Sequence, residues 1–275
     1  MEMELTASLF AGILCLALIC QYLSISLGVG YGTTLTPLLI ILGCSPLQVV
    51  PAVLLSQLIG GIIGGLAHHR MGNIMLDFRR DDNLVKERLR WLGYLPRSVD
   101  AKVVFILVGS GVIGVLIGVL TALNIPQIAL ETYIGVMVLA IGLIIVFKRS
   151  RKRAFSWKSL VGLGILSAFN KGVSGGGYVP LVTGGQIIIG QETRSSVGNT
   201  TVSVAIVCAI GFLSYLLLRG DVYWMLAIAT VIGSIIAAPF AALTVRKVAM
   251  EKLKFVIGAA IIILGAFTLM RIYFF

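Results

Sequence analysis

Hydrophobic residues fill ten stretches of the chain, and polar residues gather in the breaks between them. The clearest case runs from Leu5 to His69, where 65 successive residues include no Asp, Glu, Lys or Arg. A spanning helix needs about 20 apolar residues, so this run alone accounts for two or three membrane crossings. The pattern predicts an all-α polytopic membrane protein with segments at residues 5–27, 33–43, 47–68, 101–123, 128–147, 157–171, 177–190, 195–218, 222–245 and 252–273.

Two of these segments are too short for a straight crossing. Segment 2 (33–43) and segment 7 (177–190) fall well below the length of a full span and suit broken or re-entrant helices. Backbone without helical hydrogen bonds is tolerated at membrane depth only where protein or a water-filled cavity satisfies it. We therefore expect the two short helices to meet near the midplane of the membrane.

Composition excludes most other classes of protein. Only 12% of the residues are charged and 58% are hydrophobic, whereas soluble domains carry about 25% charged residues. A soluble enzyme, a nucleic-acid-binding protein and a disordered tail are therefore excluded. The four cysteines show neither CxxC nor Cys/His spacing, so the sequence predicts no disulfide framework, no metal site and no cofactor.

The net charge of +11 reports the orientation of the chain in the membrane. Nineteen of the 22 Lys and Arg residues fall in four breaks, at residues 69–102, 148–158, 191–195 and 246–254. Because cytoplasmic loops collect Lys and Arg, these breaks are predicted to be cytoplasmic, with both termini outside the cell membrane. The 69–102 loop is expected to form a short amphipathic helix on the membrane. His68 and His69 are interpreted as a solvated interfacial pair, with proton sensing as the alternative.

The two halves of the chain are similar to each other. Residues 28–57 and 171–204 each contain a glycine cluster, a proline, a short apolar piece, a further glycine and a polar turn. With five segments per half, the second half must lie inverted relative to the first. We divide the chain into a first membrane repeat (1–147), a basic cytoplasmic linker (148–157) and a second, inverted repeat (158–275). Inverted repeats with interrupted helices at matching positions are typical of transporters with a site near the midplane.

The glycine clusters carry the predicted chemistry. Glycine permits positive φ angles and a close approach of the backbone to a ligand. Pro37 and Pro180 follow the clusters at positions that suit a first helical turn, so the short helices are expected to begin near residues 33–34 and 177–178. Their N-termini would then face each other and bind an anion. The alternative is that the glycines only allow close helix packing.

Lys171 stands out as a charge between an apolar segment and the second glycine cluster. A buried cation is costly, so a lysine inside the membrane indicates a function, here direct contact with the anion. Snorkelling to the interface and capping of carbonyls at a broken helix end are the alternatives. Glycine N–H, hydroxyl and amide groups nearby can donate hydrogen bonds to an anion. The predicted substrate-binding residues are Lys171, Asn170, Ser174, Gly175, Gly176, Gly177, Tyr178, Gly30, Tyr31, Gly32, Thr33, Thr34, Gln57, Asn199, Thr200 and Thr201.

At these two stretches the chain resembles the TauE/SafE family, also called the 4-toluene sulfonate uptake permease family. The resemblance rests on Gly28–Pro37 with Gly43 and on Gly172–Pro180 with the residues from Gly190 to Ser203; length, segment number and duplication extend it over nearly the whole chain. The first cluster reads GVGYGTT rather than three successive glycines, and Asn170-Lys171 precede the second, so the substrate need not equal that of the named members. The resemblance implies passive or ion-coupled movement of small sulfur-containing anions such as sulfite, sulfonates, sulfoacetate or thiosulfate.

Three classes of function are compared. The leading hypothesis is a secondary transporter whose two inverted halves rock around a central anion site. The second is a channel-like facilitator for a small anion or small solute that uses the same helix ends. The third, an intramembrane enzyme, lacks an acid/base or metal constellation in the spans. The expected partners are a small anion and the lipid bilayer, without nucleic acid; a co-transported proton or other ion and an oligomeric state stay open.

Overall fold

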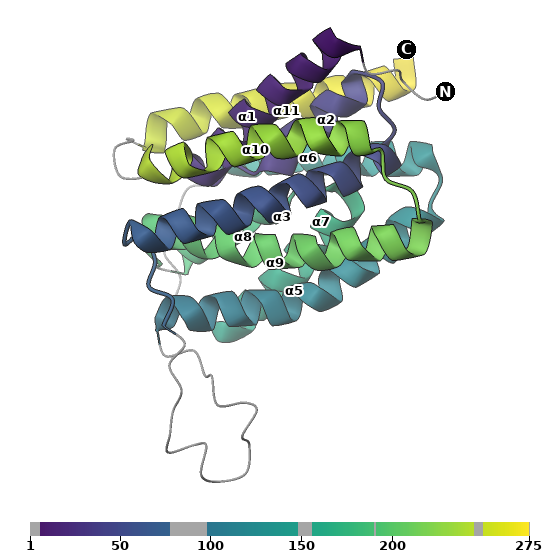
Figure 1. Cartoon of the computed structure of the whole chain (residues 1–275). Coiled ribbons are helices and arrows are strands. Elements are labelled where there is room, and N and C mark those ends of the chain that lie inside the picture. Colours follow the sequence, from purple (N-terminus) through teal and green to yellow (C-terminus); the bar gives the residue numbers. More distant parts are fainter. Residues whose placement is uncertain (1–5, 78–97, 148–155, 190, 245–249, 275) are drawn as a thin grey trace.

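The computed structural model describes residues 6–77, 98–147, 156–189, 191–244 and 250–274. Within these ranges the chain forms helices and no strand, which confirms the predicted all-α polytopic class (Figure 1). The helices are α1 (Ala7–Leu27), α2 (Tyr31–Ile41), α3 (Pro46–Arg70), α5 (Val99–Asn124), α6 (Gln127–Phe147), α7 (Trp157–Ser174), α8 (Tyr178–Ile188), α9 (Thr193–Arg219), α10 (Trp224–Thr244) and α11 (Met250–Phe274). The amphipathic helix predicted in the 69–102 loop falls largely on 78–97, outside the described residues.

Each predicted segment corresponds to one of these helices, and the ends agree within three residues. Six of the described helices are long and apolar enough to cross a membrane: α1, α3, α5, α6, α9 and α10. In contrast, α2 and α8 have 11 residues each. At 1.5 Å per residue they extend about 16 Å, which is about half of a 30 Å hydrocarbon core. The two short segments are therefore half-length helices, as predicted.

The helices of the two halves pack in matching pairs. In chain order α1, α2, α3, α5 and α6 correspond to α7, α8, α9, α10 and α11. The packing of α1 on α10 is matched by that of α7 on α5, and the packing of α3 on α10 by that of α9 on α5. In addition, α3 packs on α9 and α6 on α11, so each of these helices lies against its own counterpart. Duplication of a five-helix unit would produce such matching packing partners in the two halves. The repeat boundaries themselves stay a prediction.

The two ends of the bundle differ in charge. The chain begins α1 and finishes α11 at the same end, named here the terminal end (Figure 1). At the opposite end α3 and α10 finish, and α5, α7 and α9 begin. Its basic residues include Arg70, Lys102, Lys158 and Arg194, and we name it the basic end. The ends therefore separate as the charge pattern requires, while their orientation relative to the cell stays a prediction.

The outward faces of the helices are apolar. Phe105, Leu217 and Phe240 are 59%, 81% and 62% exposed, and similar side chains cover the outside of most helices. Exposed apolar surface on this scale is suited to lipid and not to water. Inside, branched side chains such as Leu107, Val115 and Val138 form the core between α5, α6 and α7. The outside of this bundle is therefore apolar, whereas that of a soluble bundle is polar; the packed apolar interior is common to both.

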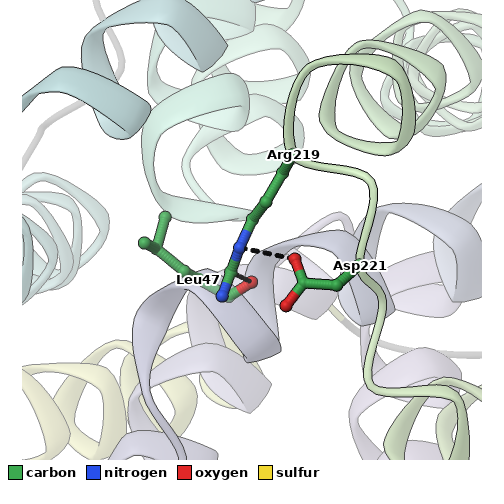
Figure 2. A network of polar contacts seen from close by, with 3 residues as sticks. All are labelled: Leu47, Arg219 and Asp221. Carbon is green, nitrogen blue, oxygen red and sulfur yellow. Dashed lines mark hydrogen bonds and ion pairs between the residues drawn. The ribbon is translucent and has the colours of Figure 1, made fainter.

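A proline in α3 leaves a carbonyl that an arginine of α9 satisfies. Pro51 has no N–H, so the Leu47 carbonyl four residues earlier loses its usual helical donor. Arg219 Nη1 donates to this oxygen at 2.6 Å, and Arg219 Nε lies 2.7 Å from Asp221 Oδ1 (Figure 2). Arg219 is an exception to the charge pattern because it lies at the terminal end. Its contacts show a structural role that joins α9 to α3.

Arg219→Ala is expected to lower the free energy of unfolding by about 1–2 kcal/mol, because it leaves the part-buried Leu47 carbonyl without a charged donor. The measurement is thermal or denaturant unfolding of the purified protein in detergent. Lys102→Ala, which removes an exposed cation at the basic end, is the matched control and should change stability by less than about 0.5 kcal/mol. Equal effects of the two substitutions would contradict the assignment.

Candidate functional site

Two glycine junctions interrupt the helices. The first junction (residues 28–30) follows α1, and the second junction (residues 175–177) follows α7. Gly28 and Gly30 have φ angles of 71° and 103°, and Gly175 and Gly177 have φ angles of 68° and 80°. Side chains other than glycine rarely adopt this left-handed region. The glycines therefore allow each long helix to stop and the short helix to turn back within the membrane.

The first turn of α2, directly after the first junction, lies in backbone contact with the second junction. A Cβ atom on Gly32 would lie 1.7 Å from the Gly175 carbonyl oxygen, and one on Gly30 would lie 2.7 Å from Pro180 Cδ. The Gly177 N–H donates to Thr33 Oγ1 at 3.1 Å, which links the two halves. The N-termini of α2 and α8 thus meet, as predicted. The alternative, close packing, also holds for these glycines, so the two interpretations are not exclusive.

The helix ends at the junctions give the site its electrostatic character. Both short helices start at the junctions and run to opposite ends of the bundle. The N-terminus of α2 therefore lies about 16 Å from the terminal end, and the N-terminus of α8 lies about 16 Å from the basic end. No side chain caps the N-terminus of α2 or α8, so their first N–H groups are suited to an anion. The C-termini of α1 and α7 lie at the same place and partly cancel this positive potential.

One proline departs from its predicted role. Pro180 is the third residue of α8 and lies in the first turn, as expected. Pro37 is the seventh residue of α2, because that helix begins at Tyr31 rather than near residues 33–34. The prediction for Pro37 is therefore wrong: it lies within the helix and removes the usual N–H donor to the Thr33 carbonyl. The freed carbonyl belongs to the first turn of α2, beside the second junction.

Lys171 is buried between the two halves, with 1% of its surface exposed. Its ammonium donates to the Gln57 side-chain oxygen on α3 and to the Gly175 carbonyl at the end of α7. Among the described residues no carboxylate lies within 4 Å of this nitrogen. An ammonium has three donors, and these contacts use two of them. Lys171 thus caps a broken helix end, the alternative considered from the sequence, and brings a full positive charge to the second junction.

Asn170 and Ser174 shape the second junction from within α7. Tyr133 on α6 donates to the Asn170 side-chain oxygen. The Ser174 hydroxyl donates to the Asn170 carbonyl at 2.7 Å and accepts from the Gly176 N–H at 3.1 Å. Tyr178 is fully buried at the start of α8. These residues lie together with Lys171, as the sequence predicts, and their polar groups mainly stabilise the turn.

In the first cluster, Thr33 is the hydroxyl that reaches the second junction. Tyr31 forms a 2.6 Å hydrogen bond with Ser56 Oγ, which donates to the Thr230 carbonyl at 3.0 Å. The Thr34 hydroxyl donates to the Tyr31 carbonyl at 2.9 Å. Tyr31 therefore anchors α2 to α3 and α10, and Thr34 bonds within its own helix turn.

The triplet 199–201 lies in a second polar group, nearer the basic end. Thr200 Oγ1 accepts from Thr183 Oγ1 at 3.1 Å and from Gln186 Nε2 at 2.9 Å, which joins α9 to α8. Asn199 Nδ2 donates to Asp100 Oδ1 at 3.0 Å. Thr201 donates to the Val197 carbonyl at 2.8 Å within α9. The hydrogen bonds of the triplet do not reach the glycine junctions, although the side chain of Thr183, the partner of Thr200, packs against Gly28.

Two residues of functional interest were missed from the sequence. Asp100 was assigned to the loop, but it lies in the first turn of α5 and binds Ser195 and Asn199 of α9. Arg271, near the end of α11, donates to the Ile40 carbonyl at the C-terminus of α2. Asp100 lies two residues after Ser98, a common helix N-cap residue, which indicated a helix start, and Arg271 stands out as the one charge after Lys254 in the last apolar segment. Neither signal identified the residues that Asp100 and Arg271 contact.

Cavities open at both ends of the bundle. A cavity of about 780 Å³ at the terminal end is lined by Ser45, Gln48, Gln127, Glu131 and Arg271 among others. A cavity of about 510 Å³ at the basic end is lined in part by Asp100, Glu192 and Ser195. A smaller one of about 160 Å³ borders the first junction at Gly28 and reaches Thr183 on α8. The contact between Gly32 of α2 and the second junction lies between the two large cavities.

Comparison with known proteins gives two matches. Residues 89–268 match the sequence profile of the family described as sulfite exporter TauE/SafE. The chain is also 28% identical over 271 residues to the probable membrane transporter protein YtnM of Bacillus subtilis (strain 168); the match covers 93% of this chain and 81% of that protein. No solved structure matches.

Gly32→Ala is expected to destabilise the fold by at least about 3 kcal/mol, because the new methyl group would overlap the backbone of the second junction. Folded yield and thermal unfolding in detergent measure this effect. Gly12→Ala in α1, where a Cβ meets nothing within 4 Å, is the matched control and should be neutral or stabilising. A Gly32→Ala protein as stable as the parent would refute the close contact.

Proposed function

Because the chain belongs to the sulfite exporter TauE/SafE family of membrane transporters, we propose that it is a secondary transporter for small sulfur-containing anions. The anions would be of the sulfite, sulfonate, sulfoacetate or thiosulfate type. They would bind at the glycine junctions, and the two halves would move around them in alternating access. The observation that carries this proposal is the meeting of two uncapped helix N-termini beside the buried Lys171.

The charges at the junctions favour an anion over a cation. The helix termini contribute partial charges of both signs, which partly cancel, whereas a protonated Lys171 contributes a full positive charge. A bound oxyanion would supply the negative charge that the described residues do not place beside its ammonium. The anion oxygens would accept from N–H groups at the start of α2 and α8 and from the third N–H of Lys171. Sulfonate and sulfite groups offer several acceptor oxygens in a small volume, which suits such a converging set of donors.

The two large cavities support alternating access rather than an open pore. One opens at the terminal end and the other at the basic end. Between them, Gly32 lies against the Gly175 carbonyl, which leaves no room for an anion to pass in this conformation. Separation of α2 from α8 would open a path on one side. The 160 Å³ cavity beside Gly28 offers space for a small anion next to the first junction.

The first test is the thermal stability of the purified protein against a panel of anions. The panel contains sulfite, thiosulfate, sulfoacetate, taurine, sulfate, chloride and acetate. A ligand that binds only the folded state raises stability by RT ln(1 + [L]/Kd), so we expect increases confined to the sulfur oxyanions. No increase with any anion at millimolar concentration would contradict the proposal.

Lys171→Met tests the role of the lysine in the same assay. We expect the apparent affinity for the sulfur anion, taken from the concentration dependence of the thermal shift, to fall at least tenfold, because the full positive charge is lost. Lys158→Ala, an exposed lysine on the same helix, is the matched control and should leave the shift unchanged. An unchanged shift in Lys171→Met would restrict this lysine to capping α7.

Flux into proteoliposomes separates the transporter from the channel-like facilitator. A transporter should show saturable uptake of the stabilising anion and competition by its analogues. A rate that rises linearly with anion concentration, without competition, would instead support the facilitator.

A further inference from the structure

The two histidines at the end of α3 lie in different surroundings. The sequence predicts a solvated pair, and His69 is indeed exposed, but His68 is fully buried. The prediction is therefore wrong for His68, because its ring turns inward to the residues that follow α3. We name residues 72–75 the wall segment, since all four line the 510 Å³ cavity at the basic end. A buried histidine bonded to this segment favours the alternative, a role in proton binding.

One amide determines which nitrogen of the His68 ring carries a hydrogen. Asn73 Nδ2 lies 3.0 Å from His68 Nδ1 and donates to the Ala242 carbonyl of α10 at 3.2 Å. If the amide were turned round, its oxygen would face that carbonyl oxygen, and two acceptors repel each other. The carbonyl thus fixes Nδ2 toward the ring. Because Nδ2 can only donate, Nδ1 has to accept and carries no hydrogen. The ring is then neutral, with its hydrogen on Nε2.

The surroundings of the ring offer no charge that would stabilise its protonated form. Nε2 forms no hydrogen bond of normal geometry among the described residues. Ile25, Gly198 and Ala242 lie against His68 from α1, α9 and α10, and none of them titrates. The titratable residues of these helices and their neighbours at this end include Tyr22 on α1, His69 and Arg70 on α3, Asp100 on α5 and Arg194 on α9. The carboxylate among them, Asp100, accepts from the Met75 N–H and from α9 and forms no ion pair with the ring.

A proton on Nδ1 would break the contacts of the wall segment. Two donors, Nδ1–H and Asn73 Nδ2, would then face each other across 3.0 Å, which is repulsive. Asn73 would have to leave the ring, and its bond to α10 would be lost with it. The next residue, Ile74, is 2% exposed and packs against Gly198 of α9. The inner contacts of the wall segment therefore depend on a neutral His68.

We propose that His68 is a proton-binding switch of the cavity at the basic end. The neutral ring holds the wall segment against α9 and α10, and the protonated ring releases it. Release exposes Ile74 and widens the cavity on the side that the segment lines. The switch goes beyond the proposed function, because it does not depend on which solute the protein moves.

The pH range of the switch follows from proton linkage. The released state binds one more proton than the closed state, so a lower pH favours release. A released ring lies in water and has the ordinary imidazole pKa of about 6.5. The equilibrium should therefore shift toward release by about tenfold between pH 7.5 and pH 5.5, with little further change above pH 7.5.

Labelling of Ile74→Cys measures release of the wall segment. The substitution is placed in the full chain after its four cysteines are replaced by alanine, and the rate of reaction with a water-soluble maleimide is followed in detergent. Each rate is divided by that of the same chain with His68→Gln at the same pH, which cancels the titration of the thiol. Glutamine can accept from Asn73 but binds no proton in this range. We expect a rate ratio near one at pH 7.5 and near ten at pH 5.5.

His69→Gln is the matched control, since it removes the exposed neighbour. Its rate, divided by that of the His68→Gln chain, should rise to the same value of about ten at pH 5.5. A ratio that stays at one at pH 5.5 with His68 present would overturn the proposal. So would a pH response that is lost in His69→Gln.

The native chain gives a second measurement that needs no cysteine. It contains two histidines, so labelling with 15N-histidine yields two ring systems in the NMR spectrum, and His69→Gln assigns them. At pH 7.5 we expect a neutral His68 with its hydrogen on Nε2 and with Nδ1 as an acceptor. A charged ring, or a hydrogen on Nδ1, would overturn the proposal even if Ile74→Cys does not fold. Neither measurement uses an anion, so their failure leaves the proposed transporter standing, and a failure of anion binding leaves the switch standing.

Discussion

A helix that stops halfway through a hydrocarbon layer leaves N–H and C=O groups that the layer itself cannot satisfy. This constraint governs the centre of the protein. Four helix ends lie there, and they are stable only because they lie against one another. The Gly177 N–H finds Thr33 of the other half, and the Gly175 carbonyl finds Lys171. The first half therefore provides a partner for the broken backbone of the second half, and Lys171 provides one within its own half.

The same constraint explains three basic residues that the charge pattern leaves aside. Lys171, Arg219 and Arg271 lie outside the four basic breaks, and each donates to a backbone carbonyl. Those carbonyls are at the end of α7, beside Pro51 in α3 and at the end of α2. In each case a helix end or a proline has removed the usual donor. Positive charges away from the basic end thus serve the backbone, and at Lys171 the same charge also lies where an anion would bind.

The sequence predicted the framework well, because its signals are local. Runs of apolar residues located every described helix, and the glycine clusters located the two junctions. Such local signals do not identify contacts between residues that are distant in the sequence. The sequence placed Asn199 and Thr200 with the second glycine cluster, whereas their contacts go to Asp100 and to α8. The sequence wrongly assigned Pro37 to the first turn of α2. The structure shows that this helix starts after Gly30, so its start does not depend on the proline. These relations join distant segments, and only the packing reveals them.

The contact between Gly32 and the Gly175 carbonyl has a consequence for how relatives can diverge. This contact is made of backbone atoms, so its shape depends little on which side chains surround it. Under the proposed function, discrimination among anions would come from the neighbouring side chains, such as Ser174 and Tyr178. Those positions are free to vary while the closure between the halves is inherited unchanged. In this way one fold can acquire a new selectivity while the backbone contact between its halves stays the same.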